Sequence, residues 1–182
     1  CRVWWMFRTM GHKDVAVLDG GLPKWMAEGH PVTDDPTPPR DRHFTARLNN
    51  TLVRSIDDVL GLIDSKREQI VDARAANRFR GEVPEPRAGL RVGHMPGAYN
   101  LPYNELIDPK TGTMLPADKL AARIAASGID PSKKVTASCG SGVTACVVAL
   151  GLYLTGAPET AVYDGSWTEW GGRADTPIVT GS

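Results

Sequence analysis

Short apolar segments alternate with segments of helical spacing between residues 45 and 182 of this chain. Strands this short that are separated by helices usually pair in parallel within one sheet, and the helices cover its faces. The pattern predicts strands at residues 69–72, 98–101, 134–138 and 160–163. We therefore expect an α/β fold in which helices flank a parallel sheet.

Three further segments predict helices. Ser55 and Asp58 have the spacing of a capping box, and the apolar residues of VLGLI follow them. Residues 115–127 predict a second helix, with Pro116 near its first turn and a glycine after its end. Residues 143–155 are mostly apolar and predict a third helix.

Charge and cysteine usage exclude several classes of function. The 182 residues contain 21 Lys and Arg and 21 Asp and Glu, so the formal net charge is zero. Proteins that bind nucleic-acid phosphates usually carry a basic excess, and no apolar run approaches the ~20 residues that cross a bilayer. The three cysteines are too few and too scattered for a disulfide framework or a zinc site. We expect a cytoplasmic protein that uses no metal or organic cofactor and binds neither nucleic acid nor membranes.

Two stretches of the sequence resemble each other at an offset of 145 positions. VAVLDGGLPKW (residues 15–25) matches TAVYDGSWTEW (residues 160–170) at Ala-Val, at Asp-Gly and at the final Trp. The same offset aligns Gly11 with Gly156. Self-similarity of this kind predicts a fragment of a two-repeat protein, in which the first repeat lacks most of its length.

Prolines and charged residues dominate the segment between the two stretches, HPVTDDPTPPRDRH. Proline fixes φ and cannot donate a backbone hydrogen bond, so this segment predicts an extended linker. We expect residues 1–30 to end the first repeat, residues 31–44 to form the linker, and residues 45–182 to form a complete second repeat.

The sequence VTASCGSGVTA places Cys139 directly after a strand and shortly before a helix. Ligands of open α/β sheets bind at this carboxyl edge. Gly140 and Gly142 allow a tight turn, so successive N–H groups and the helix dipole favour an anion at the centre of the loop. We predict that this anion is the thiolate of Cys139, acting as a nucleophile. Cys146 is expected to lie in the core.

Phosphate chemistry is disfavoured at this loop. A cysteine-dependent phosphatase needs an Arg at the sixth position after the cysteine, where this chain has Ala145. The loop carries no charge, and the phosphate-binding sequence GxxxxGK does not occur.

Three separated motifs together resemble the catalytic half of the tandem-rhodanese sulfurtransferases, and among these the enzymes that use 3-mercaptopyruvate. The motifs are DARAANRFRGEVPEPRAGLRVGHMPGAYNLPY, CGSGVTA and YDGSWTEWGGR. The resemblance covers essentially the whole chain. It implies a rhodanese-like sheet, with a partial second rhodanese-like repeat at the N-terminus.

This resemblance also implies a reaction. Cys139 would take sulfur from 3-mercaptopyruvate, release pyruvate, and pass the sulfur from a persulfide to cyanide or to a thiol acceptor such as thioredoxin or a small thiol. Arg78 and Arg87 would bind the donor carboxylate and ketone, for which guanidinium groups are well suited. The loop backbone would contact the donor and stabilise the sulfur anions through Gly140, Gly142, Val143 and Thr144.

Ser141 is implied to be the second catalytic residue. It would act in a proton relay with a His and an Asp of the first domain, which would lie upstream of Cys1 and complete the site. The neutral loop favours a monoanionic keto acid, because thiosulfate-specific relatives carry basic residues after the cysteine. Two alternatives stay open: a thiosulfate:cyanide sulfurtransferase, and a non-catalytic rhodanese-like module that relays sulfur or binds a partner.

Other residues near the motifs are expected to have structural roles. Asp72 should order the turn after its strand, and His94 should be a hydrogen-bonded turn histidine. Trp167 and Trp170 are expected to pack in the core and at the rim of the pocket. Trp4, Trp5 and Phe7 are expected to pack the N-terminal helix against the second repeat or against the missing part of the first.

Overall fold

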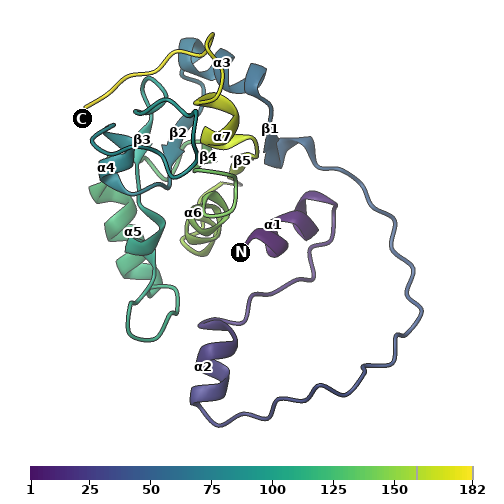
Figure 1. Cartoon of the computed structure of the whole chain (residues 1–182). Coiled ribbons are helices and arrows are strands. Elements are labelled where there is room, and N and C mark those ends of the chain that lie inside the picture. The colour runs from purple at the N-terminus through teal and green to yellow at the C-terminus, as the bar shows by residue number, and fades with distance from the viewer. Residues whose placement is uncertain (159, 182) are drawn as a thin grey trace.

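The computed structural model describes residues 1–158 and 160–181. Its centre is a five-stranded sheet, in which all strands pair in parallel in the order β1-β5-β4-β2-β3 (Figure 1). The predicted α/β fold with a parallel sheet and flanking helices is confirmed. The strands are β1 (Val53–Arg54), β2 (Gln69–Asp72), β3 (Tyr99–Asn100), β4 (Val135–Ser138) and β5 (Ala161–Tyr163).

Helices precede the sheet and connect its strands. The α-helices in the described residues are α1 (Arg2–Thr9), α2 (Gly21–Ala27), α3 (Ile56–Ser65), α4 (Ala76–Phe79), α5 (Ala117–Ala126), α6 (Ala145–Leu154) and α7 (Ser166–Trp170). Two 3₁₀ turns, η1 (Asn50–Leu52) and η2 (Tyr103–Leu106), complete the order. Within the described part of the chain, no helix has the length and apolar character needed to cross a membrane.

Each face of the sheet has its own core. Val71 and Ala137 face the side that α1, α5 and α6 cover. Ile70 and Tyr163 face the opposite side, where they pack with α3 and α7. Side chains alternate along each strand in this way because successive residues of a strand point to opposite faces.

The start of α3 follows local capping chemistry. At α3 the Ser55 hydroxyl accepts from the Asp58 N–H at 3.2 Å, and the Asp58 carboxylate accepts from the Ser55 N–H at 2.8 Å. The N–H and the hydroxyl of Ser55 both donate to this carboxylate and lower the pKa of Asp58, and the predicted capping box is confirmed. Pro116 is the N-cap residue of α5, near the first turn as predicted, and the helix runs from Ala117 to Ala126.

Some boundaries differ from the sequence prediction. The strand expected at residues 98–101 is only β3, and the helix expected at residues 143–155 starts at Ala145. Val143 and Thr144 belong to the loop that precedes α6. The two residues of β1 were not predicted, since so short a strand has no readable periodicity.

The N-terminal helix packs on the sheet domain. Trp4 and Trp5 of α1 are buried against α6, and the Trp5 indole donates to the Leu52 carbonyl at 3.1 Å. Phe7 is instead 45% exposed, with its ring 5.5 Å from that of His12. The expected packing role therefore holds for the two tryptophans, whereas Phe7 lies on the outer surface of α1.

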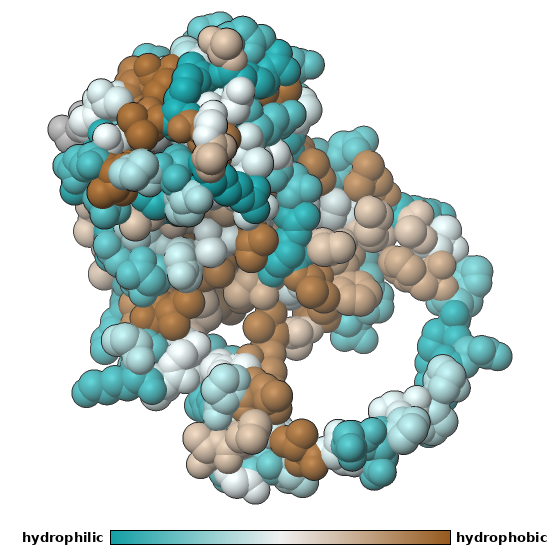
Figure 2. Space-filling view, viewed as in Figure 1, coloured by the Kyte–Doolittle hydropathy of each residue, from teal (hydrophilic) through white to brown (hydrophobic). Residues whose placement is uncertain are grey.

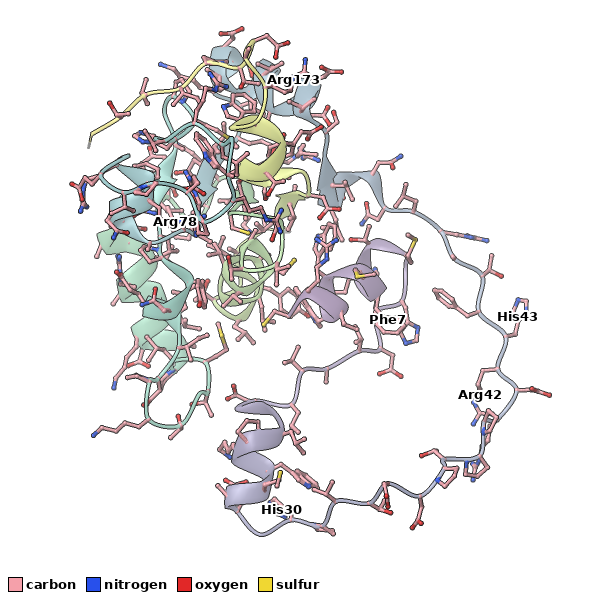
Figure 3. The ribbon with its side chains drawn as sticks, in the orientation of Figure 1. Phe7, His30, Arg42, His43, Arg78 and Arg173 are labelled. Atoms are coloured by element: carbon pink, nitrogen blue, oxygen red, sulfur yellow. The ribbon has the colours of Figure 1, made fainter. Side chains whose placement is uncertain are left out.

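Residues 30–49 contain neither helix nor strand, and residues 31–48 are exposed. This segment forms a wide arc away from the sheet, with Arg42 and His43 pointing into solvent (Figure 3). Its surface is mostly hydrophilic (Figure 2). It has the extended form expected of a proline-rich linker.

The 145-residue offset of the sequence recurs in the helix boundaries. α1 ends at Thr9 and α6 at Leu154, while α2 begins at Gly21 and α7 at Ser166. Gly21 and Ser166 share a left-handed backbone, with φ of 61° and 50°. α1 and α6, whose ends differ by this offset, pack against each other.

Candidate active site

Cys139 follows β4, the central strand of the sheet. β4 is buried along its length, because β5 and β2 pair with its two edges and helices cover both faces. The Cys139 N–H donates to the Ser166 hydroxyl at 3.1 Å, and its carbonyl accepts from the Trp167 N–H at 2.9 Å. The cysteine predicted as nucleophile is thus fixed at the edge where such sheets bind ligands.

Ser166 holds this arrangement with an uncommon backbone conformation. Its φ of 50° lies in the left-handed region, which costs an L-residue about 1–2 kcal/mol. The buried hydroxyl donates to the Tyr163 carbonyl at 2.8 Å while it accepts from Cys139. These two hydrogen bonds offset the cost and fix the start of α7 beside the cysteine.

Five N–H groups follow Cys139, from Gly140 to Thr144. Within the described residues none of them donates to a protein atom, and the Cys139 sulfur accepts no hydrogen bond. Consecutive unpaired N–H groups ahead of a helix form a site for an anion, and the positive end of the α6 dipole adds to it. The loop therefore keeps its donors available for a bound anion.

A cavity of about 560 Å³ opens beside this loop. It brings together seven of the eight site residues predicted from the sequence, and Gly142 does not line it. Cys139 itself is only 2% exposed, so the cavity is its route to a ligand. The seven residues are Arg78, Arg87, Cys139, Gly140, Ser141, Val143 and Thr144.

Arg78, which follows β2 on α4, lies within the folded sheet domain (Figure 3). Its Nε and Nη2 donate to the Glu85 carboxylate at 3.2 and 2.5 Å. A Cβ on Gly140 would lie 3.3 Å from Nη2, so the guanidinium group packs directly over the loop. Hydrogen bonding to Glu85 raises the pKa of Arg78, and the neighbouring Cys139 adds a smaller effect of the same sign.

Arg87 reaches the same loop through Thr168. Its Nη1 donates to the Thr168 hydroxyl at 2.7 Å. That hydroxyl donates in turn to the Gly140 carbonyl at 2.6 Å, and the Thr168 N–H donates to the same carbonyl at 2.9 Å. α7 therefore positions both the loop and the second arginine of the cavity.

Glu85 belongs to a buried charge network that the sequence analysis did not identify. It also accepts from Nη1 of Arg74 at 3.0 Å, and the Arg74 side chain is fully buried. Arg74 pairs in addition with Asp72 and lies over the Trp167 ring, 4.1 Å from its centre. As expected, Asp72 orders the turn after its strand, because it accepts from the Arg74 N–H at 2.9 Å.

The missed residues carry only weak signals in the sequence. Glu85 stands between two prolines, and Arg74 and Arg78 are four residues apart around the start of a helix. Charged residues in so constrained a segment could have suggested an ion-pair network. Thr168 carries no comparable signal, since its contacts join residues that are distant in the sequence.

The opposite side of the loop is closed by other residues. The Gly142 carbonyl accepts from the Cys146 thiol at 3.2 Å and from Arg2 at 3.4 Å. Arg2 also forms an ion pair with Asp164, which raises its pKa. Gly142 has a φ of 75°, and a Cβ there would lie 2.6 Å from the Asp164 carboxylate. Only glycine fits this passage.

Two expectations concern groups away from the cavity. His94 is buried, with Nδ1 2.8 Å from the Phe79 carbonyl and its ring stacked 3.6 Å from that of Phe79, as expected for a structural histidine. Burial lowers its pKa. Among residues 1–158 and 160–181, no group of three or more His, Cys, Asp or Glu side chains is arranged to hold a metal ion.

Comparison with known proteins shows which sequences and structures this chain is similar to. The sequence model of the rhodanese-like domain matches residues 55–173. The chain is 43% identical to 3-mercaptopyruvate sulfurtransferase of Rattus norvegicus over 98% of its length, and 46% identical to thiosulfate sulfurtransferase of Bos taurus over 95%. It spans only 60% and 58% of these two relatives.

A solved structure with the same fold is SseA of Escherichia coli, a 3-mercaptopyruvate sulfotransferase. It superposes with a TM-score of 0.77 at 39% sequence identity. The match covers 91% of this chain and 61% of SseA.

Proposed function

Because this chain belongs to the rhodanese-like domain family, we propose that it is the catalytic part of a sulfurtransferase that works through a persulfide on Cys139. One observation carries the proposal. Cys139 lines a cavity together with two arginines and a loop whose N–H groups have no partner in the described residues. This combination suits an anionic sulfur donor and an anionic sulfur intermediate.

In the first step the Cys139 thiolate attacks the thiol sulfur of 3-mercaptopyruvate. The S–S bond forms as the carbon–sulfur bond of the donor breaks, and its electron pair goes to the carbon next to the ketone. That carbon takes the donor's thiol proton, so the products are pyruvate and the Cys139 persulfide anion. The N–H groups of the loop, Gly140 to Thr144, would stabilise the negative charge before and after transfer.

In the second step an acceptor thiolate attacks the outer sulfur of the persulfide. The S–S bond to Cys139 breaks, the enzyme thiolate returns, and the acceptor leaves as a persulfide. We propose thioredoxin or a small thiol as acceptor, with cyanide as a substitute in vitro. A reducing compartment such as the cytoplasm, in which the three free cysteines stay reduced, belongs to this proposal.

The arginines supply the donor site in this proposal. Arg78 lies over Gly140 and Arg87 is joined to it through Thr168, so both cations lie beside the loop. They would hold the carboxylate and ketone of 3-mercaptopyruvate while Ser141 takes part in a proton relay. The uncharged loop favours this monoanion over thiosulfate. Thiosulfate remains the second candidate donor, because the bovine relative named for it is 46% identical.

We further propose that residues 1–30 end a first rhodanese-like domain, followed by a linker at residues 31–44 and the catalytic domain at residues 45–182. The shared offset of helix boundaries supports this division. The earlier part of the first domain would complete the site with a His and an Asp for the relay through Ser141.

Steady-state kinetics test the proposal. With a thiol acceptor present, the protein should release pyruvate from 3-mercaptopyruvate with a kcat/KM at least tenfold above that for thiosulfate. A higher kcat/KM for thiosulfate would mean that thiosulfate is the donor, and the persulfide mechanism would stand. Turnover of neither donor would instead favour a non-catalytic module.

A further inference from the structure

A buried carboxylate forms part of the wall of the proposed donor site. The Glu85 side chain is only 1% exposed, although it lines the same cavity as Cys139. Its backbone is constrained by Pro84 and Pro86 on either side. An acid beside a site for anions needs a reason, because it repels the ligand that the site would bind.

Arg74 does not supply that reason. Its charge is already balanced by Asp72, to which Nε and Nη2 both donate, and Nη2 also donates to the Gly93 carbonyl at 2.8 Å. Glu85 uses one oxygen for Arg74 and both for Arg78. Arg74 is therefore paired with two carboxylates, one more than its single charge requires. Glu85 places its negative charge next to Arg78.

Glu85 also determines how Arg78 can be used. Two of the three nitrogens of the Arg78 guanidinium group, Nε and Nη2, donate to Glu85, and Nη1 has no hydrogen-bond partner among the described residues. The group lies over Gly140, next to the reacting cysteine. It is thus fixed in place and partly neutralised before any donor arrives.

We propose that Glu85 is a specificity-determining residue, which lowers the positive charge at Cys139 so that the site accepts monoanionic sulfur donors and rejects dianionic ones. This inference rests on the proposed sulfurtransferase function and extends it to the charge class of the donor. Without Glu85, Arg78 and Arg87 would present two uncompensated cations beside the loop. With it, and with Arg74 balanced by Asp72, the charged groups around the cavity sum to about +1, which matches a single carboxylate.

The charge at Cys139 can be measured without any sulfur transfer. Iodoacetate, an anion, and iodoacetamide, its neutral analogue, alkylate the same thiolate, so the ratio of their rates reports the local charge. We expect Glu85→Gln to raise the ratio of the iodoacetate rate to the iodoacetamide rate at Cys139 about tenfold. One neighbouring charge commonly shifts an ionisation equilibrium by a factor of ten or more, and we expect an effect of similar size on the approach of an anionic reagent. Peptide mass spectrometry assigns the alkylation to Cys139.

Glu82 supplies a matched control on the same segment. It forms an exposed ion pair with Arg80 and does not line the cavity. Glu82→Gln should change the ratio by less than twofold. Glu85→Asp, which retains the charge, should also stay within twofold of the wild type. A ratio in Glu85→Gln equal to that of Glu82→Gln would overturn the inference, and so would equal shifts in Glu85→Asp and Glu85→Gln.

Glu85→Gln leaves Arg74 without one partner and can prevent folding, which circular dichroism would detect. The triple variant Asp72→Asn/Arg74→Gln/Glu85→Gln then carries the same prediction, because it removes the buried pair of Arg74 and Asp72 together and leaves Arg78 and Arg87 without a compensating carboxylate, as in Glu85→Gln.

Donor kinetics separate this inference from the proposed function. Glu85→Gln should raise the kcat/KM ratio of thiosulfate to 3-mercaptopyruvate about tenfold. Normal sulfur transfer with an unchanged donor ratio overturns the role of Glu85 alone. A shifted alkylation ratio in a protein that uses neither donor overturns the proposed function and leaves the charge effect established.

Discussion

Cys139 and Cys146 lie on opposite sides of one loop, and both residues are almost inaccessible, with exposures of 2% and 0%. Cys139 lines the cavity that holds Arg78 and Arg87. Cys146 lies in the core, where its thiol donates to the Gly142 carbonyl and burial raises its pKa to about 11. Burial of the residue therefore does not distinguish the two thiols. What differs is that the Cys139 residue lines a cavity with two cations, whereas the Cys146 thiol is enclosed in the core beside the Gly142 carbonyl and Arg2.

Replacing each cysteine in turn should give the largest contrast. Cys139→Ser should reduce turnover by at least about a thousandfold, because the persulfide cannot form on a hydroxyl. Cys146→Ser should retain activity within about threefold, since its thiol lies behind the loop. Pyruvate release in a coupled assay measures both. Equal losses in the two variants would break the comparison.

The pH dependence of alkylation should sharpen it further. A pKa of about 11 means that about one Cys146 thiol in a thousand is ionised at pH 8 in the folded protein. Because the thiolate is the reactive form, iodoacetamide should label Cys146 only above about pH 10, or after unfolding. At pH 8 we expect Cys139 to react at least a hundredfold faster, as followed by peptide mass spectrometry. Labelling of Cys146 in the folded protein below about pH 10 would contradict the assignment of this thiol to the core.

Gly142 separates the two sides, so a side chain there should disturb both. Gly142→Ala places a Cβ against Asp164 in a left-handed conformation, and we expect a loss of about 3 kcal/mol in the free energy of unfolding. Gly156→Ala is the matched control: its φ of 78° is similar, but its Cβ would meet open space, so about 1 kcal/mol should be lost. Urea unfolding measures both. Equal losses would show that backbone conformation alone matters.

Arg78→Ala should have the smallest of these effects on turnover. It removes a cation from the Cys139 side only, so we expect KM for 3-mercaptopyruvate to rise about tenfold with a smaller change in kcat. Arg80, which pairs with Glu82 outside the cavity, is the control, and Arg80→Ala should leave KM within twofold. An unchanged KM in Arg78→Ala would remove this residue from the donor site.

Local sequence predicted the parts of the fold that local chemistry determines. The strand residues of β2, the capping box at Ser55, and the strand–loop–helix unit around Cys139 each have a signal within a few residues. The burial of Trp4 and Trp5 followed from their apolar character. In these cases periodicity and capping preferences agree with the tertiary structure, so the prediction succeeds.

The rest of the site depends on contacts between distant segments. Thr168 meets Gly140 only because α7 packs beside the loop, and Arg2 reaches Gly142 across the interface of α1 with the sheet domain. Glu85 gains its position from two arginines that precede it by seven and eleven residues. No pattern of residue spacing in the sequence predicts such contacts. Gly142 was expected to line the cavity and does not. This prediction failed for the same reason, because the sequence could not show that Asp164 packs against Gly142.

The central claim is that Cys139 carries the transferred sulfur, and the mass of its peptide tests this most directly. After the full chain is incubated with 3-mercaptopyruvate without an acceptor, the peptide containing Cys139 should gain the mass of one sulfur atom. Addition of a thiol acceptor should remove it, and fragmentation of this peptide, which also contains Cys146, should place the added sulfur on Cys139 and none on Cys146. A sulfur found on Cys146, or turnover with no added sulfur on Cys139, would contradict the account.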